Sequence, residues 1–280
     1  MRIGVMYDRD LPPAQLPAFA RELDLLGVDD LWVVEDMGWT GGISSAATAL
    51  AVTSRLRVGI GIAPAPLRNP MLLAMEFGNL AALHPGRFVA GIGHGVQPWM
   101  YQVGAAVPSP LTLLEETVTA VRALLRGETV TLHGKAVHLD GVRLVHPPAE
   151  VPPIVTGVMS PKSLALSGRV AQGTIVPEGF GPAQISAALK QIDATSAHEM
   201  IVFTHLFAAS DAALADQTRD ERAADQGVPP EEVAMASGSP AEAAATVRRL
   251  HESGADTVVL RPMGSDPISL VRDLMGALRR

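Results

Sequence analysis

Short apolar runs recur along the chain, and amphipathic segments separate most of them. Eight of these runs are typical of strands, and they begin near residues 2, 31, 58, 87, 154, 173, 200 and 256. The runs are too uniformly apolar for a sheet with one wet face, which is the pattern of parallel strands covered on both sides. The spacing therefore predicts a parallel sheet with helices packed over it.

Helical patterns follow most of the runs, over 13–26, 43–53, from 69 onward, and over 111–125, 161–171, 182–195, 240–253 and 267–278. Two segments differ. Residues 129–145 alternate around Gly134 and Gly141, which indicates a β-hairpin, and residues 211–233 are polar and less regular. Eight βα units in one domain, residues 1–280, predict a (β/α)₈ TIM barrel with a small hairpin insertion; the alternative is a doubly wound open sheet.

Composition narrows the class of protein. Hydrophobic residues make up 48% and charged residues 18%, which favours a well-packed globular enzyme. The net charge of −7 argues against nucleic acid or an anionic membrane as a partner. The chain has no cysteine, which excludes disulfides, a thiolate nucleophile and thiolate-bound zinc. No apolar run approaches the length of a membrane span, and the first residues lead into a strand without a signal-peptide pattern, so we expect a cytoplasmic protein.

Glycines gather at the carboxyl ends of two predicted strands, the edge where parallel α/β proteins bind ligands. Gly59 and Gly61 end the third strand, and Gly91-Ile92-Gly93-His94-Gly95 ends the fourth. The second cluster is not the full dinucleotide fingerprint, and a glycine-rich turn without a ligand explains it equally well. Glycine at this edge lets a flat ligand approach the backbone.

A second candidate site lies where the fifth strand meets a helix. Gly157 and Met159 form a turn of small and flexible residues, and Ser160-Pro161 is a favoured start for a helix. Free amides at a helix N-terminus bind phosphate, although ordinary capping also accounts for Ser160 and Pro161.

The remaining polar residues suggest no protein-based nucleophile or metal. Glu35 and Asp36 end the second strand and form a carboxylate pair, which is more often structural than catalytic. The eight histidines lack metal-ligand spacing, and no nucleophile elbow is present. Other polar residues near predicted strand ends could line a pocket, but each alone is more simply structural: Tyr7, Asp8, Tyr101, Thr204, His205 and Arg261. The pattern favours a reactive group supplied by a bound organic cofactor.

Several motifs together resemble the luciferase-like monooxygenase superfamily, especially its branch that uses coenzyme F420, a deazaflavin. They occur in this order: 27–35 (GVDDLWVVE), 57–62 (RVGIGI) with 67–70 (LRNP), 83–88 (LHPGRF) leading into 91–93 (GIG), and 238–240 (GSP) with 254–256 (GAD). The resemblance implies a (β/α)₈ barrel, a flavin or deazaflavin at the carboxyl edge, and a homodimer.

Carried over by position, the resemblance assigns cofactor-binding roles. Gly61-Ile62 corresponds to a bulge with a non-prolyl cis peptide behind the tricyclic ring, and the end of the second strand lies beside the ring. The other segments correspond to parts that contact the cofactor's side chain and phosphate. The candidate cofactor-binding residues are Glu35, Asp36, Gly61, Ile62, Gly93, His94, Gly95, Gly157, Met159 and Ser160.

Two departures from the family pattern affect catalysis. Asp36 stands where members often have histidine, and Val96 stands where the sugar-phosphate dehydrogenase branch has a glutamate acid. We therefore do not expect that branch's substrate, and Asp36 and His94 are the catalytic candidates that remain.

Three functions are consistent with these residues. The first is hydride transfer between F420 and a small organic substrate; the alternatives are an FMN-dependent monooxygenase and a barrel that binds a flavin-like ligand without turnover. We expect the pocket to be lined by residues 40–43, 99–107 and 177–182 and by the hairpin. These segments carry little charge apart from Glu178, which favours an uncharged substrate.

Overall fold

Eight parallel strands form a closed barrel in the computed structural model, which describes residues 1–280. Each strand pairs with the next, and β11 pairs with β1 to close the ring. The predicted (β/α)₈ barrel is confirmed, and the open sheet is excluded by this closure. In order, the strands are β1 (Arg2–Met6), β2 (Asp30–Val33), β3 (Arg57–Ile60), β5 (Phe88–Gly93), β8 (Ile154–Gly157), β9 (Gly173–Val176), β10 (Glu199–Leu206) and β11 (Thr257–Pro262).

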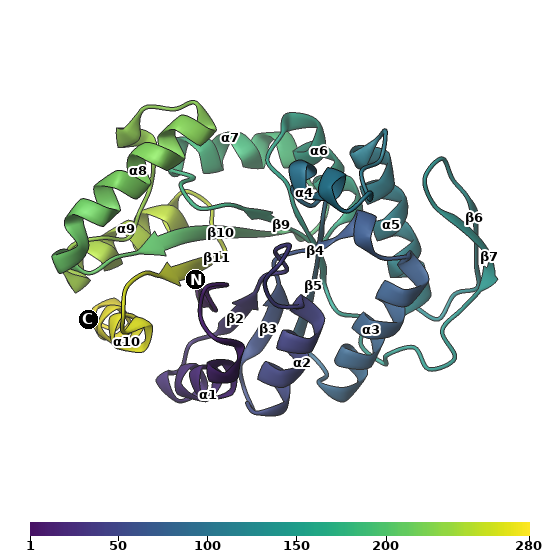
Figure 1. Ribbon diagram of the computed structural model, residues 1–280, viewed down its shortest axis with the longest axis horizontal. Coiled ribbons are helices and arrows are strands. Elements are labelled where there is room, and N and C mark those ends of the chain that lie inside the picture. The colour runs from purple at the N-terminus through teal and green to yellow at the C-terminus, as the bar shows by residue number, and fades with distance from the viewer.

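Helices surround the barrel (Figure 1). Those predicted from the sequence are α1 (Leu16–Leu26), α2 (Gly42–Ala51), α3 (Pro70–Leu83), α5 (Pro110–Leu125), α6 (Pro161–Val170), α7 (Pro182–Ile192), α9 (Pro240–Glu252) and α10 (Pro267–Leu278). Short elements not anticipated are β4 (Ala63–Pro64), α4 (Gln97–Gln102) and four 3₁₀ turns, at Pro13–Gln15, Ala65–Leu67, Ala209–Asp211 and Pro230–Glu232.

One segment was described wrongly from the sequence. Residues 211–233 contain α8 (Ala212–Gln226), a regular helix of 15 residues. The buried residues of α8 are only Ala215 and Ala223, so the helix lacks the wide apolar stripe that reveals amphipathic helices. Because most residues of α8 are polar, the sequence showed no helical periodicity of apolar residues there.

The expected hairpin is present as β6 (Val130–His133) and β7 (His138–Val142), which lie outside α5 (Figure 1). Glu116 of α5 holds its turn, because its carboxylate accepts hydrogen bonds of 2.8 Å from the amides of Lys135, Ala136 and Val137. These bonds lower the pKa of Glu116 against the opposing effect of burial.

Side chains inside the barrel change from apolar to polar toward its carboxyl end. Nine apolar side chains form the inner core: Met6, Trp32, Val34, Val89, Val155, Ile175, Ile201, Phe203 and Val259. Because side chains alternate along a strand, residues two positions further on point the same way. Asp8, His205 and Arg261 follow Met6, Phe203 and Val259 at that spacing and form a polar layer above the core.

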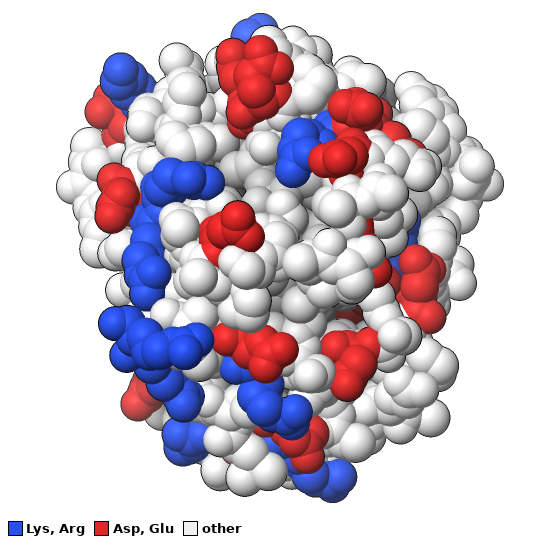
Figure 2. Space-filling view, turned by 90° about the vertical axis from the view of Figure 1, so that its left-hand side faces the viewer, with Lys and Arg blue, Asp and Glu red and all other residues white.

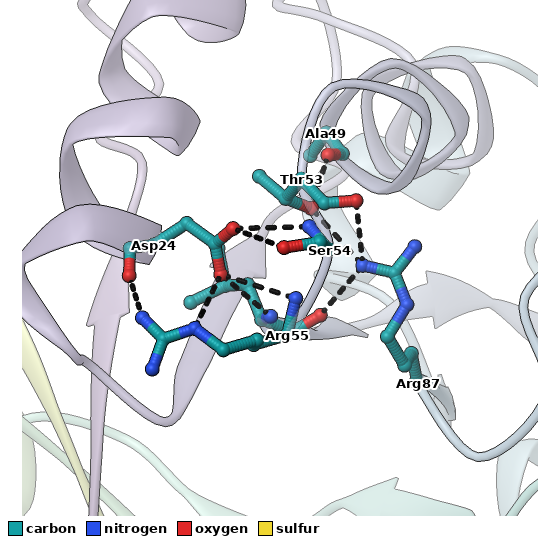
Figure 3. A network of polar contacts seen from close by, with 7 residues as sticks. Asp24, Ala49, Thr53, Ser54, Arg55 and Arg87 are labelled. Carbon is teal, nitrogen blue, oxygen red and sulfur yellow. Dashed lines mark hydrogen bonds and ion pairs between the residues drawn. The ribbon is translucent and has the colours of Figure 1, made fainter.

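The opposite end of the barrel is held by buried ion pairs and backbone contacts. Arg57 forms ion pairs with Asp30 and Glu199, each at 2.6 Å. Nearby, the Arg87 guanidinium donates to the carbonyl oxygens of Leu50 at 2.9 Å and Thr53 at 3.0 Å. Figure 3 shows the loop between α2 and β3 held from two sides, by the Asp24 carboxylate on one side and by Arg87 on the other. These contacts fix the strands at the end away from the glycine-rich edge.

The surface carries both signs of charge. On the face shown in Figure 2, most basic side chains gather along the left side and the lower edge, and acidic side chains are scattered over the face. None of the helices combines the length and apolar character needed to cross a membrane.

Candidate active site

A cavity of about 1120 Å³ opens at the carboxyl end of the strands. Its walls come from segments after most of the strands, which gathers residues distant in sequence. Nine of the ten predicted cofactor-binding residues line it: Glu35, Asp36, Gly61, Ile62, His94, Gly95, Gly157, Met159 and Ser160. The predicted residues thus share one cavity.

Ile62 occupies a space that two glycines leave for it. A Cβ on Gly157 would lie 2.7 Å from Ile62 Cγ2, and a Cβ on Gly93 would lie 2.7 Å from Ile62 Cγ1. Such contacts are shorter than real Cβ atoms make, so both positions require glycine while Ile62 keeps its place. The Gly61-Ile62 peptide bond is cis, as the resemblance implied.

Gly93 is the exception among the predicted binding residues, because it does not line the cavity. It lies on β5 beneath Ile62, and the missing side chain serves packing. A role in contacting a ligand stays a prediction for this residue.

Glu35 and Asp36 are both held by arginines. Glu35 forms a two-pronged ion pair with Arg68, whose Nη2 lies 2.9 Å from Oε2, and it also accepts from the Gly42 amide at 2.8 Å. Asp36 accepts from Arg9 Nη1 at 2.6 Å. Arg9 in turn lies 4.3 Å over the ring of Trp39. Glu35 therefore has the structural surroundings that were favoured for it from the sequence.

His94 joins a chain of hydrogen bonds that leads to the start of α6. Its Nδ1 lies 3.2 Å from the Pro110 carbonyl oxygen, so Nδ1 donates and Nε2, 3.1 Å from Ser163 Oγ, accepts. Ser160 Oγ donates to Ser163 Oγ at 3.0 Å. Burial lowers the pKa of His94, although its bond with Pro110 acts in the opposite direction. The imidazole is therefore neutral and both of its nitrogens are engaged.

The N-terminus of α6 is open toward the cavity. Ser160 is the N-cap residue, but its side chain makes no capping hydrogen bond. Met159, Ser160 and Ser163 line the cavity there. Unpaired amides at a helix N-terminus, together with the helix dipole, attract an anion such as a phosphate.

The carboxyl ends of β1, β9, β10 and β11 contribute a second polar group of residues. Arg261 lies between two carboxylates: its Nε donates to Asp8 at 2.6 Å and its Nη1 to Glu178 at 3.3 Å. His205, which pairs in register with Arg261, is 4% exposed and lines the same cavity. The sequence identified three of these residues as strand-end residues without giving them a role.

Several residues around the cavity were missed or misplaced from the sequence. Arg9 had no motif to mark it, and Arg68 lay within the LRNP motif of the family resemblance but was given no role; their ion pairs show what both residues do. The hairpin contributes nothing to the cavity, contrary to the expectation, because Glu116 fixes it against α5. Tyr7 donates to the Pro12 carbonyl oxygen and Thr204 to that of Ala234, so both are structural.

The cavity is also more charged than expected. Four arginines and four acidic residues line it, so their formal charges cancel: Arg9, Arg68, Arg222 and Arg261 against Glu35, Asp36, Glu178 and Glu221. Each arginine forms an ion pair with a carboxylate. No guanidinium is therefore left without an acidic partner.

Comparison with known proteins identifies the family. The family model described as luciferase-like monooxygenase matches residues 1–226.

The chain belongs to this family.

Relatives within the luciferase-like family include oxidoreductases. A 5,10-methylenetetrahydromethanopterin reductase of Methanolobus tindarius is 29% identical over 69% of the chain, and the match spans 59% of that protein. An F420-dependent glucose-6-phosphate dehydrogenase of Nakamurella multipartita is 30% identical over 51% of the chain and 42% of its own length. The matches thus span about half the length of these curated relatives, from 42% to 59% for the two described.

Solved structures of luciferase-like proteins share the fold. The coenzyme F420-dependent tetrahydromethanopterin reductase from Methanopyrus kandleri superposes with a TM-score of 0.87 at 17% identity, over 99% of this chain and 98% of that one. The oxygenating constituent of 3,6-diketocamphane monooxygenase from Pseudomonas putida, in complex with FMN, gives a TM-score of 0.76 at 17% identity, over 99% and 96% of the two chains. These likenesses establish the shared barrel.

Proposed function

We propose that the protein is an oxidoreductase that transfers hydride between coenzyme F420 and a small organic substrate. The observation that carries the proposal is one cavity that combines a glycine-lined wall at Gly61 and Gly157 with the uncapped N-terminus of α6. The names of the relatives, an F420-dependent dehydrogenase among them, support the same cofactor.

The residues present fit such a cofactor. A cavity of about 1120 Å³ is larger than the usual pocket for a drug-sized ligand, which leaves room for a ring system and a substrate together. Gly157 offers backbone without a side chain at the wall, and a Cβ there would collide with Ile62. Met159 and Ser160, at the start of α6, would hold the phosphate. When bound, the deazaflavin supplies or accepts hydride at its C5.

The protein's own contribution is to bind, orient and exclude water. Trp39 and Trp99 lie at the cavity with ring centroids 6.2 Å apart and provide apolar cover for it. Asp36 and His94 stay our candidates for proton transfer. Asp36 must first leave Arg9, and His94 must leave Ser163, before either can exchange a proton with a substrate.

FMN-dependent monooxygenation is the second candidate function. The supporting observation is that an uncapped helix N-terminus serves any phosphate-bearing cofactor, and FMN also combines a tricyclic ring with a phosphate. The FMN complex among the structures of the same fold is consistent with this candidate.

Titration of the protein with each cofactor under anaerobic conditions tests the proposal. We expect micromolar binding of F420 and weaker binding of FMN, followed by oxidation of reduced F420 with at least one compound from a panel of enones, imines, aldehydes and nitro compounds. Micromolar binding of FMN without binding of F420 would contradict the first function and support the second. Binding of F420 without turnover of any compound would support a non-catalytic carrier.

Three further expectations are part of this proposal. The sequence favours a small uncharged substrate, and the paired arginines around the cavity support the exclusion of a phosphorylated one, which calls for free arginines. The homodimer is implied by resemblance to the family. The cytoplasmic location stays a prediction from the sequence.

A further inference from the structure

His205 is a buried histidine without a hydrogen bond to its ring. Its Nδ1 is enclosed with no partner, and Nε2, which is not enclosed, is the nitrogen that a ligand in the cavity can reach. The ring stacks on Phe207, with centroids 5.9 Å apart, and this packing fixes its plane. Because Nε2 makes no hydrogen bond within the protein and His205 lines the cavity, this nitrogen is available to accept a hydrogen bond from a ligand.

Glu178 is the second group with free capacity. Arg261 is the only side-chain donor that reaches its carboxylate, at 3.3 Å, through Oε1. Burial would raise the pKa of Glu178, but His205 and Arg261 lower it overall, so the group is a carboxylate. A carboxylate can accept about four hydrogen bonds, which leaves Glu178 open to a donor from a ligand.

The charge of this group of residues defines what it accepts. Asp8 and Glu178 contribute two negative charges and Arg261 one positive charge, which leaves −1 when His205 is neutral. Burial lowers the pKa of His205 to about 4, although Glu178 acts in the opposite direction, so the ring is neutral at pH 7. An anionic group of a ligand would be repelled by the carboxylates of Asp8 and Glu178, and the Arg261 guanidinium is already paired with both of them.

We propose that His205 and Glu178 form a substrate-specificity subsite that binds a hydroxyl or protonated amine group and rejects carboxylate and phosphate groups. The hydroxyl donates to the imidazole of His205, and the ammonium group pairs with the carboxylate of Glu178. The identification of this ligand as the substrate rests on the proposed function.

Three probes of the same shape test the subsite: cyclohexanol, cyclohexylammonium and cyclohexanecarboxylate. Their affinities are measured by calorimetry, both with and without F420, and their position is checked by the ring NMR signal of His205, assigned as the signal that the His205→Phe variant lacks. We expect the first two probes to shift this signal and to bind at least tenfold more tightly than the carboxylate.

Variants separate recognition from packing. His205→Phe keeps a ring against Phe207 and removes Nε2, so it should weaken cyclohexanol at least tenfold. It also removes the enclosed, unpaired Nδ1, so the melting temperature should stay equal or rise. Glu178→Gln should weaken cyclohexylammonium at least tenfold and leave cyclohexanol within twofold. Thr117→Val is the matched control, because it also removes a buried, unpaired polar atom, but on α5 away from the cavity; it should change no probe's affinity.

Equal affinity for the three probes, or unchanged cyclohexanol binding in His205→Phe, would overturn the subsite. If F420 binds and the probes do not discriminate, the subsite alone is refuted. If F420 fails to bind while the probes show the expected order, the proposed function is refuted and the subsite stands.

Discussion

Replacement of Ser160 by Asp tests the phosphate position at the start of α6. Ser160 is the N-cap residue, lines the cavity and makes no capping bond. Aspartate is an equally good N-cap and interacts favourably with the helix dipole, so the variant should fold with unchanged or slightly higher stability. The variant loses the hydrogen bond that Ser160 Oγ donates to Ser163 and gains a negative charge at the proposed phosphate site.

The expected loss of affinity follows from the repulsion between two charges. A carboxylate about 5 Å from a phosphate repels it by roughly 1 to 3 kcal/mol for an effective dielectric constant between about 80 and 20. Ser160 is exposed, which places the effect toward the lower end of that range. Since about 1.4 kcal/mol changes a dissociation constant tenfold, F420 should bind roughly five- to a hundredfold more weakly.

Fluorescence titration with F420 measures this loss, and two controls isolate the charge. Ser160→Asn has the size and capping preference of the aspartate variant without its charge, so it should bind F420 within about threefold of the wild type. The deazaflavin chromophore without its phosphate should bind all three proteins alike. Equal F420 affinity in the Asp and Asn variants would refute the phosphate assignment, and so would a matching loss for the phosphate-free ligand.

Three more outcomes follow from the structure. Gly157→Ala brings a Cβ to 2.7 Å from Ile62, so it should lower the free energy of unfolding in urea by about 1 to 3 kcal/mol and weaken the binding of F420. Gly276→Ala has open space around it and should be neutral or stabilising. Equal effects of the two substitutions would contradict the packing around Ile62. His205 has a pKa of about 4, below the value of about 6.5 in the unfolded chain. Its contribution to the free energy of unfolding is therefore complete above pH 6.5 and falls by roughly 3 kcal/mol as the pH drops toward 4. His205→Phe should reduce the difference in urea midpoint between pH 7.5 and 4.5. An unchanged difference would contradict the idea that His205 is neutral in the folded protein and takes up a proton on unfolding. Arg57→Met leaves a buried carboxylate unpaired and should cost about 3 to 5 kcal/mol by the same assay; a loss below 1 kcal/mol would contradict the buried pair.

The fold could be predicted from the sequence because each buried parallel strand is a short, almost uniformly apolar run. All eight strands begin within about three residues of the expected positions, and the hairpin lies where alternation around Gly134 and Gly141 placed it. Helix α8 was missed because few of its residues are buried, so its sequence lacks the regular spacing of apolar residues that marks a helix.

The candidate site was readable only in part. Glycines and the Ser160-Pro161 start of α6 meet local backbone requirements, so the residue types alone mark these positions. Arg9 and Arg68 act through partners that lie 27 and 33 residues away, and no local pattern records such pairs. His205 was visible as a strand-end residue, but its lack of a hydrogen-bond partner exists only in three dimensions.

The sparse packing of α8 also bears on how relatives diverge. Thr218, Glu221 and Arg222 on this helix line the cavity, whereas Ala215 and Ala223 are its only buried residues. Mutations on its exposed surface are expected to change stability little, because such substitutions usually lie within about 0.5 kcal/mol of neutral. The helix can therefore accumulate sequence changes faster than the strands beneath it. If the proposed function holds, changes in this one surface helix would alter which substrates fit the cavity while the barrel stays unchanged.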